Sequence, residues 1–161
     1  MRLATPTFGL VLALSLAGCS AESGDAAQSA PARADTESAT ASEQLPLSGD
    51  LVSQGTRTTG TVTLTAATDT EFTLTLSGFS TGPGDDLRLQ LSPGELVKGA
   101  DGYYSINDNT RIELEGAVDP QAPEQTFSVP MMVLDTWQVR SFTVYDYANR
   151  TALGSAALTG E

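Results

Sequence analysis

The chain has 161 residues, a formal net charge of -12 from 8 Lys and Arg against 20 Asp and Glu, no histidine and one cysteine. This acidity argues against nucleic acid and bare anionic lipid as partners, since both are polyanions. Without histidine the chain lacks the usual general base and the commonest zinc, copper and haem ligand, so we expect neither enzymatic activity nor a metal site. The only lysine, Lys98, lies in no nucleophile motif.

A short apolar run over residues 8–16 follows the positively charged Arg2. The run is far shorter than the roughly 20 apolar residues that a transmembrane helix needs, and it predicts a signal peptide over residues 1–18. It ends in Leu16, Ala17, Gly18 and Cys19, which resembles the bacterial lipobox. The resemblance implies lipidation of Cys19, anchoring in the bacterial cell membrane or envelope, and a protein that faces outside the cytoplasm. The alternative is an ordinary cleaved signal in which Cys19 is an incidental thiol.

Residues 19–44 are predicted to form the lipidated N-terminus and a stalk. From Ser20 to Gln44 the chain contains no aromatic or large aliphatic residue, only small and polar ones with many Ala, Ser and Glu. Such a segment cannot bury enough apolar surface to order itself, so we expect a disordered tether. A flexible chain of this length would hold the following domain about 25–30 Å from the lipid. The membrane is therefore the expected partner through the lipid on Cys19.

From Leu45 onward the pattern changes to an alternation of period two, which predicts strands. The expected strands are Thr61–Thr65, Phe72–Leu76, Leu87–Leu91, Arg111–Glu115, Gln125–Val129 and Trp137–Tyr147. The first two are expected to form a hairpin, and the last has no cleanly polar face, so we expect it to be central. No segment shows helical periodicity of useful length. The sequence therefore predicts an all-β domain over residues 45–161, an antiparallel sandwich or barrel with one core and no disulfide.

Several polar or sulfur-containing groups are candidates for acid–base or metal-binding sites. Asp85-Asp86 is explained better by a solvated loop than by an acid–base pair, and the oxygen-rich loop Asp101–Asn109 is more typical of turns than of a calcium site. Met131-Met132 would face opposite sides of a strand, which favours packing over soft-metal binding. Trp137 is predicted to anchor the core.

Three pieces of the chain resemble one known family. They are Leu47–Leu51 with Thr59–Leu64, the Gly-Pro-containing strand start Phe79–Ser92, and the closing segments Ser141–Asp146 and Leu153–Leu158. In order and spacing they resemble the DM-thirteen (electron-transfer DM) domain family, found in bacterial surface lipoproteins and in multidomain animal proteins. The resemblance spans nearly all of residues 45–161. It implies a compact all-β domain and a proposed redox role that depends on a cysteine in the closing strand.

Asp146 stands at the position of that cysteine, which makes it the candidate family-site residue; the alternative is an ordinary edge-strand aspartate. Two functions follow from different classes. The first is a noncatalytic surface binding or accessory module that meets a protein or cell-wall partner. The second is an electron-transfer component with a noncovalently bound prosthetic group, haem or flavin. No residue pattern predicts a cofactor, so the first function is the expected one.

Overall fold

The computed structural model describes residues 41–160. Leu16, Ala17, Gly18, Cys19 and the stalk up to residue 40 lie outside this range. Among the described residues no helix is long and apolar enough to cross a membrane. The elements in chain order are the 3-10 helix η1 (Ala41–Gln44) and then β1 (Leu47–Asp50), β2 (Val52–Ser53), β3 (Thr59–Ala66), β4 (Glu71–Ser80), β5 (Leu87–Ser92), β6 (Leu96–Lys98), β7 (Tyr104–Ile106), β8 (Ile112–Leu114), β9 (Glu124–Pro130), α1 (Met132–Thr136), β10 (Ser141–Asp146), β11 (Thr151–Ala157) and β12 (Thr159–Gly160).

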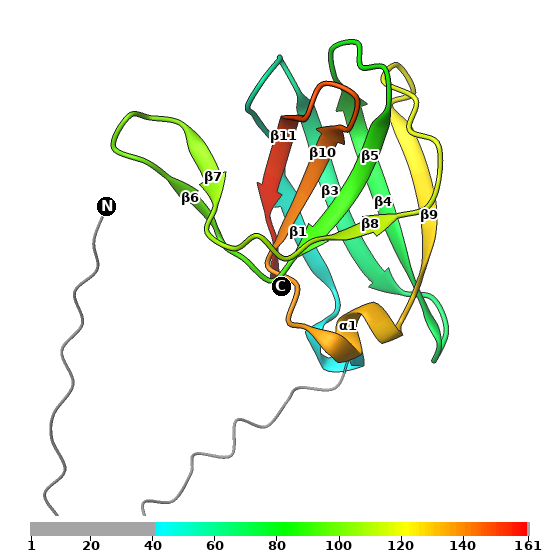
Figure 1. Cartoon of the computed structure of the whole chain (residues 1–161). Helices are drawn as coiled ribbons and strands as arrows, with labels where there is room; N and C mark the ends of the chain where they lie inside the picture. The colour runs from blue at the N-terminus through cyan, green and yellow to red at the C-terminus, as the bar shows by residue number, and fades with distance from the viewer. Residues whose placement is uncertain (1–40, 161) are drawn as a thin grey trace, which may run out of the picture. The chain divides into compact units, whose positions relative to one another are not determined.

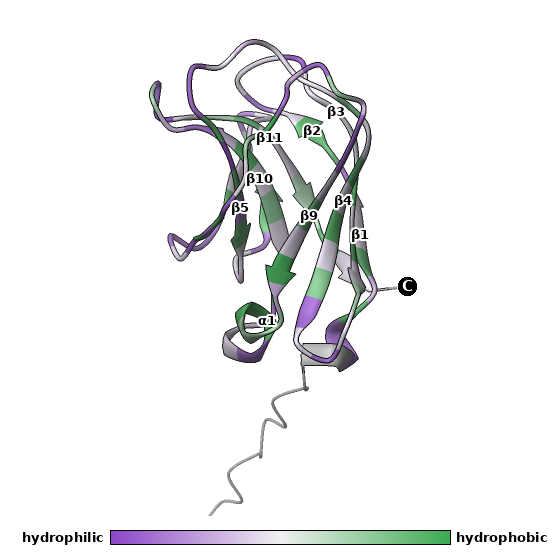
Figure 2. Cartoon of the chain, turned by 90° about the vertical axis from the view of Figure 1, so that its right-hand side faces the viewer, coloured by the Kyte–Doolittle hydropathy of each residue, from purple (hydrophilic) through white to green (hydrophobic). Residues whose placement is uncertain are grey.

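Two five-stranded antiparallel sheets pack face to face as a sandwich (Figure 1). The first has the strand order β12-β1-β3-β4-β9, and the second has the order β2-β11-β10-β5-β8. Hydrophobic residues alternate with polar ones along the strands of both sheets (Figure 2), and the buried hydrophobic side chains of both sheets form one cluster. This arrangement confirms the predicted all-β fold and, of its two variants, selects the sandwich.

The alternation of threonine and aliphatic residues explains why β3 and β4 form the predicted hairpin. Val62 and Leu64 are fully buried, as are their neighbours on β4, while the threonines between them face outward. The hairpin closes through residues 67–70, where the Thr68 hydroxyl accepts hydrogen bonds from the amides of Thr70 (3.2 Å) and Glu71 (3.0 Å). Local turn chemistry and period-two burial therefore agree on this register.

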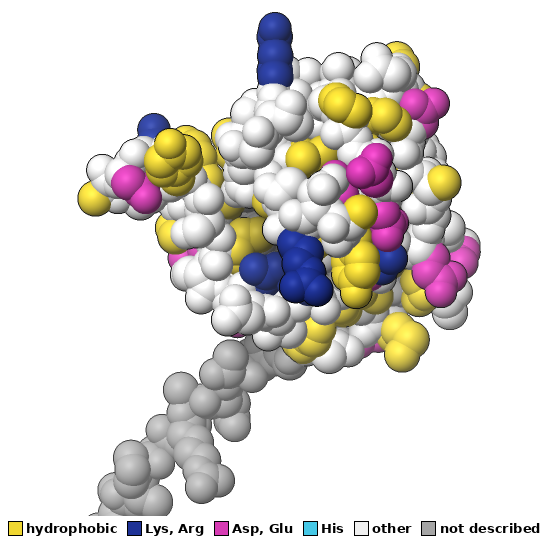
Figure 3. Space-filling model, turned by 45° about the horizontal axis from the view of Figure 1, so that its top comes forward, with side chains coloured by type: hydrophobic (Ala, Val, Ile, Leu, Met, Phe, Trp, Pro, Cys, Tyr) yellow, Lys and Arg dark blue, Asp and Glu magenta, His cyan; other side chains and the backbone are white. Residues whose placement is uncertain are grey.

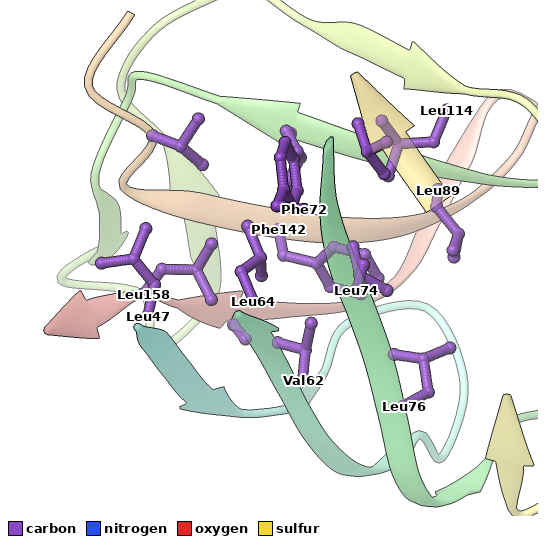
Figure 4. Close-up of a cluster of buried hydrophobic side chains, with 14 of the residues drawn as sticks. Leu47, Val62, Leu64, Phe72, Leu74, Leu76, Leu89, Leu114, Phe142 and Leu158 are labelled. Carbon is purple, nitrogen blue, oxygen red and sulfur yellow. The ribbon is translucent and has the colours of Figure 1, made fainter. Parts of the chain in front are cut away.

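The core lies between the sheets and takes side chains from both (Figure 4). Its largest fully buried side chains are Phe72, Phe79 and Phe142, surrounded by leucines and valines. Trp137, predicted as the core anchor, is only half-buried and lies outside this cluster. The prediction was wrong because Trp137 belongs to the connection after α1 and not to a strand that faces the interior.

The start of the predicted strand Trp137–Tyr147 also departs from the prediction, because residues 137–140 do not form a strand. Residues 132–136 form the short helix α1, and the strand begins only at Ser141. Met131 is buried in the core, whereas Met132 is 68% exposed, so the two methionines do face apart, but from a helix start and not from a strand. The predicted central position of the closing strand is confirmed, because β10 lies between β11 and β5.

A two-stranded hairpin, β6 and β7, stands away from the sandwich (Figures 1 and 3). It carries exposed Tyr103 and Val97, and the ammonium group of Lys98 lies 5.4 Å from the ring centre of Tyr104. The oxygen-rich loop after Gly99 forms its tip and its return. There Asp101 Oδ1 accepts a hydrogen bond from the amide of Tyr103 (3.1 Å), so this carboxylate serves the predicted turn chemistry.

Candidate functional site

The candidate family-site residue, Asp146, lies at the end of β10 where three loops meet. These are residues 54–58, 81–86 and 147–150, all at the end of the sandwich opposite η1 and α1 (Figure 1). Asp146 pairs with Leu87 of β5 on one side and with Thr151 of β11 on the other. It is therefore not the edge-strand aspartate that we considered as the alternative. With 2% of its surface exposed, it is a buried carboxylate at a strand end.

Two N–H groups of Asn149 donate to this carboxylate. The amide nitrogen of Asn149 lies 3.1 Å from Oδ1, and the side-chain Nδ2 of Asn149 lies 2.8 Å from Oδ2. The backbone amides of Asp85 and Ala148 also lie close enough to favour its charged form. Asp146, whose carboxylate offers about four lone-pair positions, is thus bound on both oxygens by its own turn. It links the loop before β5 to the turn between β10 and β11.

This environment holds Asp146 in its ionised form. The hydrogen bond from the Asn149 side chain lowers the pKa of Asp146 below its ordinary value of 3.8, and the amides of Asn149, Asp85 and Ala148 act in the same direction. Burial acts the other way, because it disfavours the charged form, but it is outweighed. The group is thus a charged structural acceptor at the end of β10.

Near Asp146, Arg88 joins three side chains of the loop end and the second sheet. Its guanidinium makes a bidentate pair with Asp86, with Nε 3.1 Å from Oδ1 and Nη2 2.8 Å from Oδ2, and Nη1 lies 2.8 Å from Oε2 of Glu113. The same guanidinium lies over the ring of Tyr147, 3.7 Å from its centre. Asp86 has a lowered pKa, chiefly because of the hydrogen bond from Arg88. Asp86 is therefore an ion-pair partner in a loop, as its predicted lack of an acid–base role requires.

The glycine in the loop before β5 has a steric reason. A Cβ on Gly84 would lie 2.2 Å from Cδ2 of Leu87 and 3.1 Å from Oδ2 of Asp146. The loop therefore passes directly against the buried carboxylate, which is how the amide of Asp85 reaches it. Two of the three sequence pieces, the strand start 79–92 and the closing segment 141–146, are brought together here as the neighbouring strands β5 and β10.

Sequence reasoning did not identify the partners of Asp146. Asn149 lies three residues further along the chain, a spacing at which Asp and Asn side chains commonly close turns, so a local signal was present. The contact with Asp85 joins residues 61 positions apart in the sequence and had no such signal. Nor was the hydroxyl contact between buried Thr58 and Thr81, 2.8 Å apart, detectable from either segment alone.

Two surface pockets lie away from this loop end. One, of about 680 Å³, lies near η1 and is lined by Gln44, Leu47, Arg140 and Leu158, among others. The other, of about 440 Å³, lies between the outer strands β8 and β9. In the described part of the chain no group of three or more His, Cys, Asp or Glu side chains is placed to hold a metal ion.

Comparison with known proteins gives one positive result. No curated protein and no solved structure matches the chain. A family model described as Electron transfer DM13 matches residues 50–158, more than half of the chain, from the end of β1 to just beyond β11. The chain accordingly belongs to the Electron transfer DM13 family.

Proposed function

We propose that this protein is a lipid-anchored envelope protein that presents its DM13 domain outside the cytoplasm as a noncatalytic binding or accessory module. The support for the anchor is the sequence Leu16-Ala17-Gly18-Cys19 behind a short apolar run. Lipid chains contribute about 0.8 kcal/mol per buried methylene, so an acylated Cys19 would hold the protein stably at a membrane. The support for the module is the family membership of residues 50–158.

One observation carries this proposal: the described chain enters the sandwich at the end opposite the loops around Asp146 (Figure 1). Gln44 fastens that entering end, because its side chain donates to the carbonyl of Leu134 (2.8 Å) and accepts from the amide of Val139 (3.2 Å). A tether attached there leaves the loop end, with its Arg88 and Tyr147 surface, clear of the attachment point. Loops on a rigid sandwich are where such folds usually carry binding residues.

Residues 41–160 offer few side chains that could ligate a haem. Axial haem ligands are His, Cys, Met or Tyr side chains, and this range contains neither His nor Cys. Met131 is packed in the core, and the exposed Met132, Tyr103 and Tyr147 lie on separate elements. The electron-transfer alternative would therefore need a flavin or haem held by contacts other than these. For this reason we place the binding module first.

The anchor is tested by expressing the full chain and its Cys19→Ala variant in a bacterial host. We expect the unaltered chain to sediment with membranes and its N-terminal peptide to carry the mass of a lipidated Cys19. The variant should lose the lipid mass and leave the membrane fraction after processing. An unmodified Cys19 on a cleaved, soluble chain would show that the signal is an ordinary one and would refute the anchor.

The module is tested by the absorbance spectrum and native mass of the chain purified from its own host. A colourless protein at its expected lipidated mass supports a binding or accessory role. A stoichiometric chromophore or extra bound mass would instead support the electron-transfer function and overturn our proposal.

A further inference from the structure

A small polar cavity lies on the outer face of the second sheet, outside the core and reaching the loop end at Gln54. It has a volume of about 120 Å³, roughly the space that four waters occupy in the liquid. Ser105 and Ile106 of β7 form part of its wall, so the base of the β6–β7 hairpin closes it. The polar side chains that line it are Gln54, Gln90, Arg111, Thr143, Tyr145 and Ser155.

Its floor is buried but incompletely hydrogen-bonded. Gln90 is 7% exposed, and its Nε2 faces Oε1 of Glu113 at 3.4 Å. Since a carboxylate only accepts, this contact fixes the orientation of the amide. Oε1 of Gln90 then has no partner in residues 41–160, where every fully buried side-chain polar atom does have one, so this oxygen faces accessible space. The cavity is the space that Gln90 lines.

Two hydroxyl groups beside Gln90 are in a similar state. Thr143 and Ser155 are 4% and 1% exposed, and their oxygens lie 2.9 Å apart. Each hydroxyl carries one proton, and one proton is enough for the hydrogen bond between them. The second proton is therefore available to an acceptor in the cavity.

Arg111 supplies a positive charge at the same cavity. It is half-buried, and its Nη1 donates to Oγ of Ser92 (3.0 Å) and to the carbonyls of Thr110 (2.8 Å) and Asp108. Its guanidinium forms no ion pair with any described carboxylate, whereas Arg88 and Arg140 both do. The pKa of Asp108 is lowered chiefly by hydrogen bonds from Thr110 and to a smaller extent by the charge of Arg111, but no carboxylate in residues 41–160 lies within ion-pair distance of this guanidinium. A half-buried arginine that faces a cavity without a paired carboxylate is a site for an external anion.

We propose that this cavity binds a small hydroxycarboxylate of about two to four carbons, a size set by its volume of a few waters. The ligand's carboxylate would accept hydrogen bonds from Nε and Nη2 of Arg111. It would also accept the hydroxyl proton that Thr143 and Ser155 do not use between themselves. The ligand's hydroxyl would donate to Oε1 of Gln90, and its carbon chain would contact Ile106 and Ala152, which also line the cavity. The chain's distant negative charges oppose an anion only weakly, because charges beyond about 8 Å are screened at physiological salt, whereas the carboxylate of Glu113, 3.4 Å from Nε2 of Gln90, opposes it at short range.

The test uses the full chain, lactate as the probe, and acetate as a ligand of similar size that lacks the hydroxyl. Calorimetry should show one lactate per chain, and the side-chain amide signal of Gln90 should shift with the same saturation. Acetate should bind about tenfold more weakly, because it leaves Oε1 of Gln90 unsatisfied. No saturable binding of lactate, or binding of phosphate in its place, would overturn the proposal.

Matched variants locate the site. Arg111→Gln should weaken lactate binding by at least about tenfold, as expected for a lost charge-assisted hydrogen bond. Arg57→Gln removes the same charge from an exposed position away from the cavity and should leave the affinity unchanged. Gln90→Met should reduce the preference for lactate over acetate. Thr143→Val should weaken the binding of both ligands, and it locates the site even if Arg111→Gln does not fold. Equal affinity in all four variants would show that lactate binds elsewhere.

Discussion

Thr58 tests whether the loop end is held together by buried hydroxyl contacts. Its Oγ1 donates to the carbonyl of Leu153 (2.9 Å) and lies 2.8 Å from Oγ1 of Thr81, and both threonines are almost fully buried. Thr58→Val keeps the shape but removes the hydroxyl. The carbonyl of Leu153 keeps its hydrogen bond from the Gln54 amide (2.9 Å). Losing the hydrogen bond from the Thr58 hydroxyl to this carbonyl therefore costs only about 1 kcal/mol of stability. The Thr81 hydroxyl loses its partner inside the protein, which adds about 1–3 kcal/mol.

We therefore expect Thr58→Val to lower the free energy of unfolding by about 2–4 kcal/mol, a large part of the 5–15 kcal/mol typical of a domain. Chemical denaturation followed by circular dichroism measures this change. In the double variant with Thr81→Val no buried hydroxyl remains unpaired, so its cost should fall below the sum of the single costs by about 1–2 kcal/mol. Strictly additive costs would refute the reasoning. Thr61→Val, which removes a hydroxyl bound to the exposed Asp50, is the control and should change stability by less than about 0.5 kcal/mol.

Three further predictions follow from the structure. Because the folded state lowers the pKa of Asp146, its contribution to stability is present above its ordinary pKa of 3.8 and is lost as the pH falls through the folded value; Asp146→Asn should therefore lower stability at neutral pH and flatten its fall in acid, as urea titrations across acidic pH would show. Gly49→Ala should cost about 1–3 kcal/mol or more, because the added Cβ would lie 2.0 Å from the carbonyl oxygen of Ala157, whereas Gly78→Asn, at a φ of 60° in open space, should cost less than about 1 kcal/mol; equal midpoints in thermal denaturation would contradict this contrast. Phe142→Ala, in the centre of the core, should cost about 3–5 kcal/mol by the same measurement, and a cost below 1 kcal/mol would show that the sheets are not closely packed there.

The strands that were predicted correctly share one property: their alternation follows burial on one face. In β3 and β4 the aliphatic residues face the core and the threonines face outward, so a local pattern reports a tertiary fact. In the closing segment the alternation of residue types does not follow burial, because both faces of β10 are buried. Residues 132–136 turn into a helix and the strand starts only at Ser141, although Trp137 and Val139 continue the alternation backward. Here the alternation was accidental, and packing of the connection decided the structure.

The sequence by itself determined the class of this protein: the period-two pattern and turn residues specify antiparallel strands, the order of its motifs identifies the family, and Leu16–Cys19 predicts an anchored address. These features are encoded by neighbours in the chain. Only the tertiary structure decided that Asp146 is buried against the loop before β5 and that Arg111 faces a cavity with Gln90. Both arrangements depend on contacts between residues far apart in sequence, and burial is a property of the assembled neighbourhood that no single segment contains.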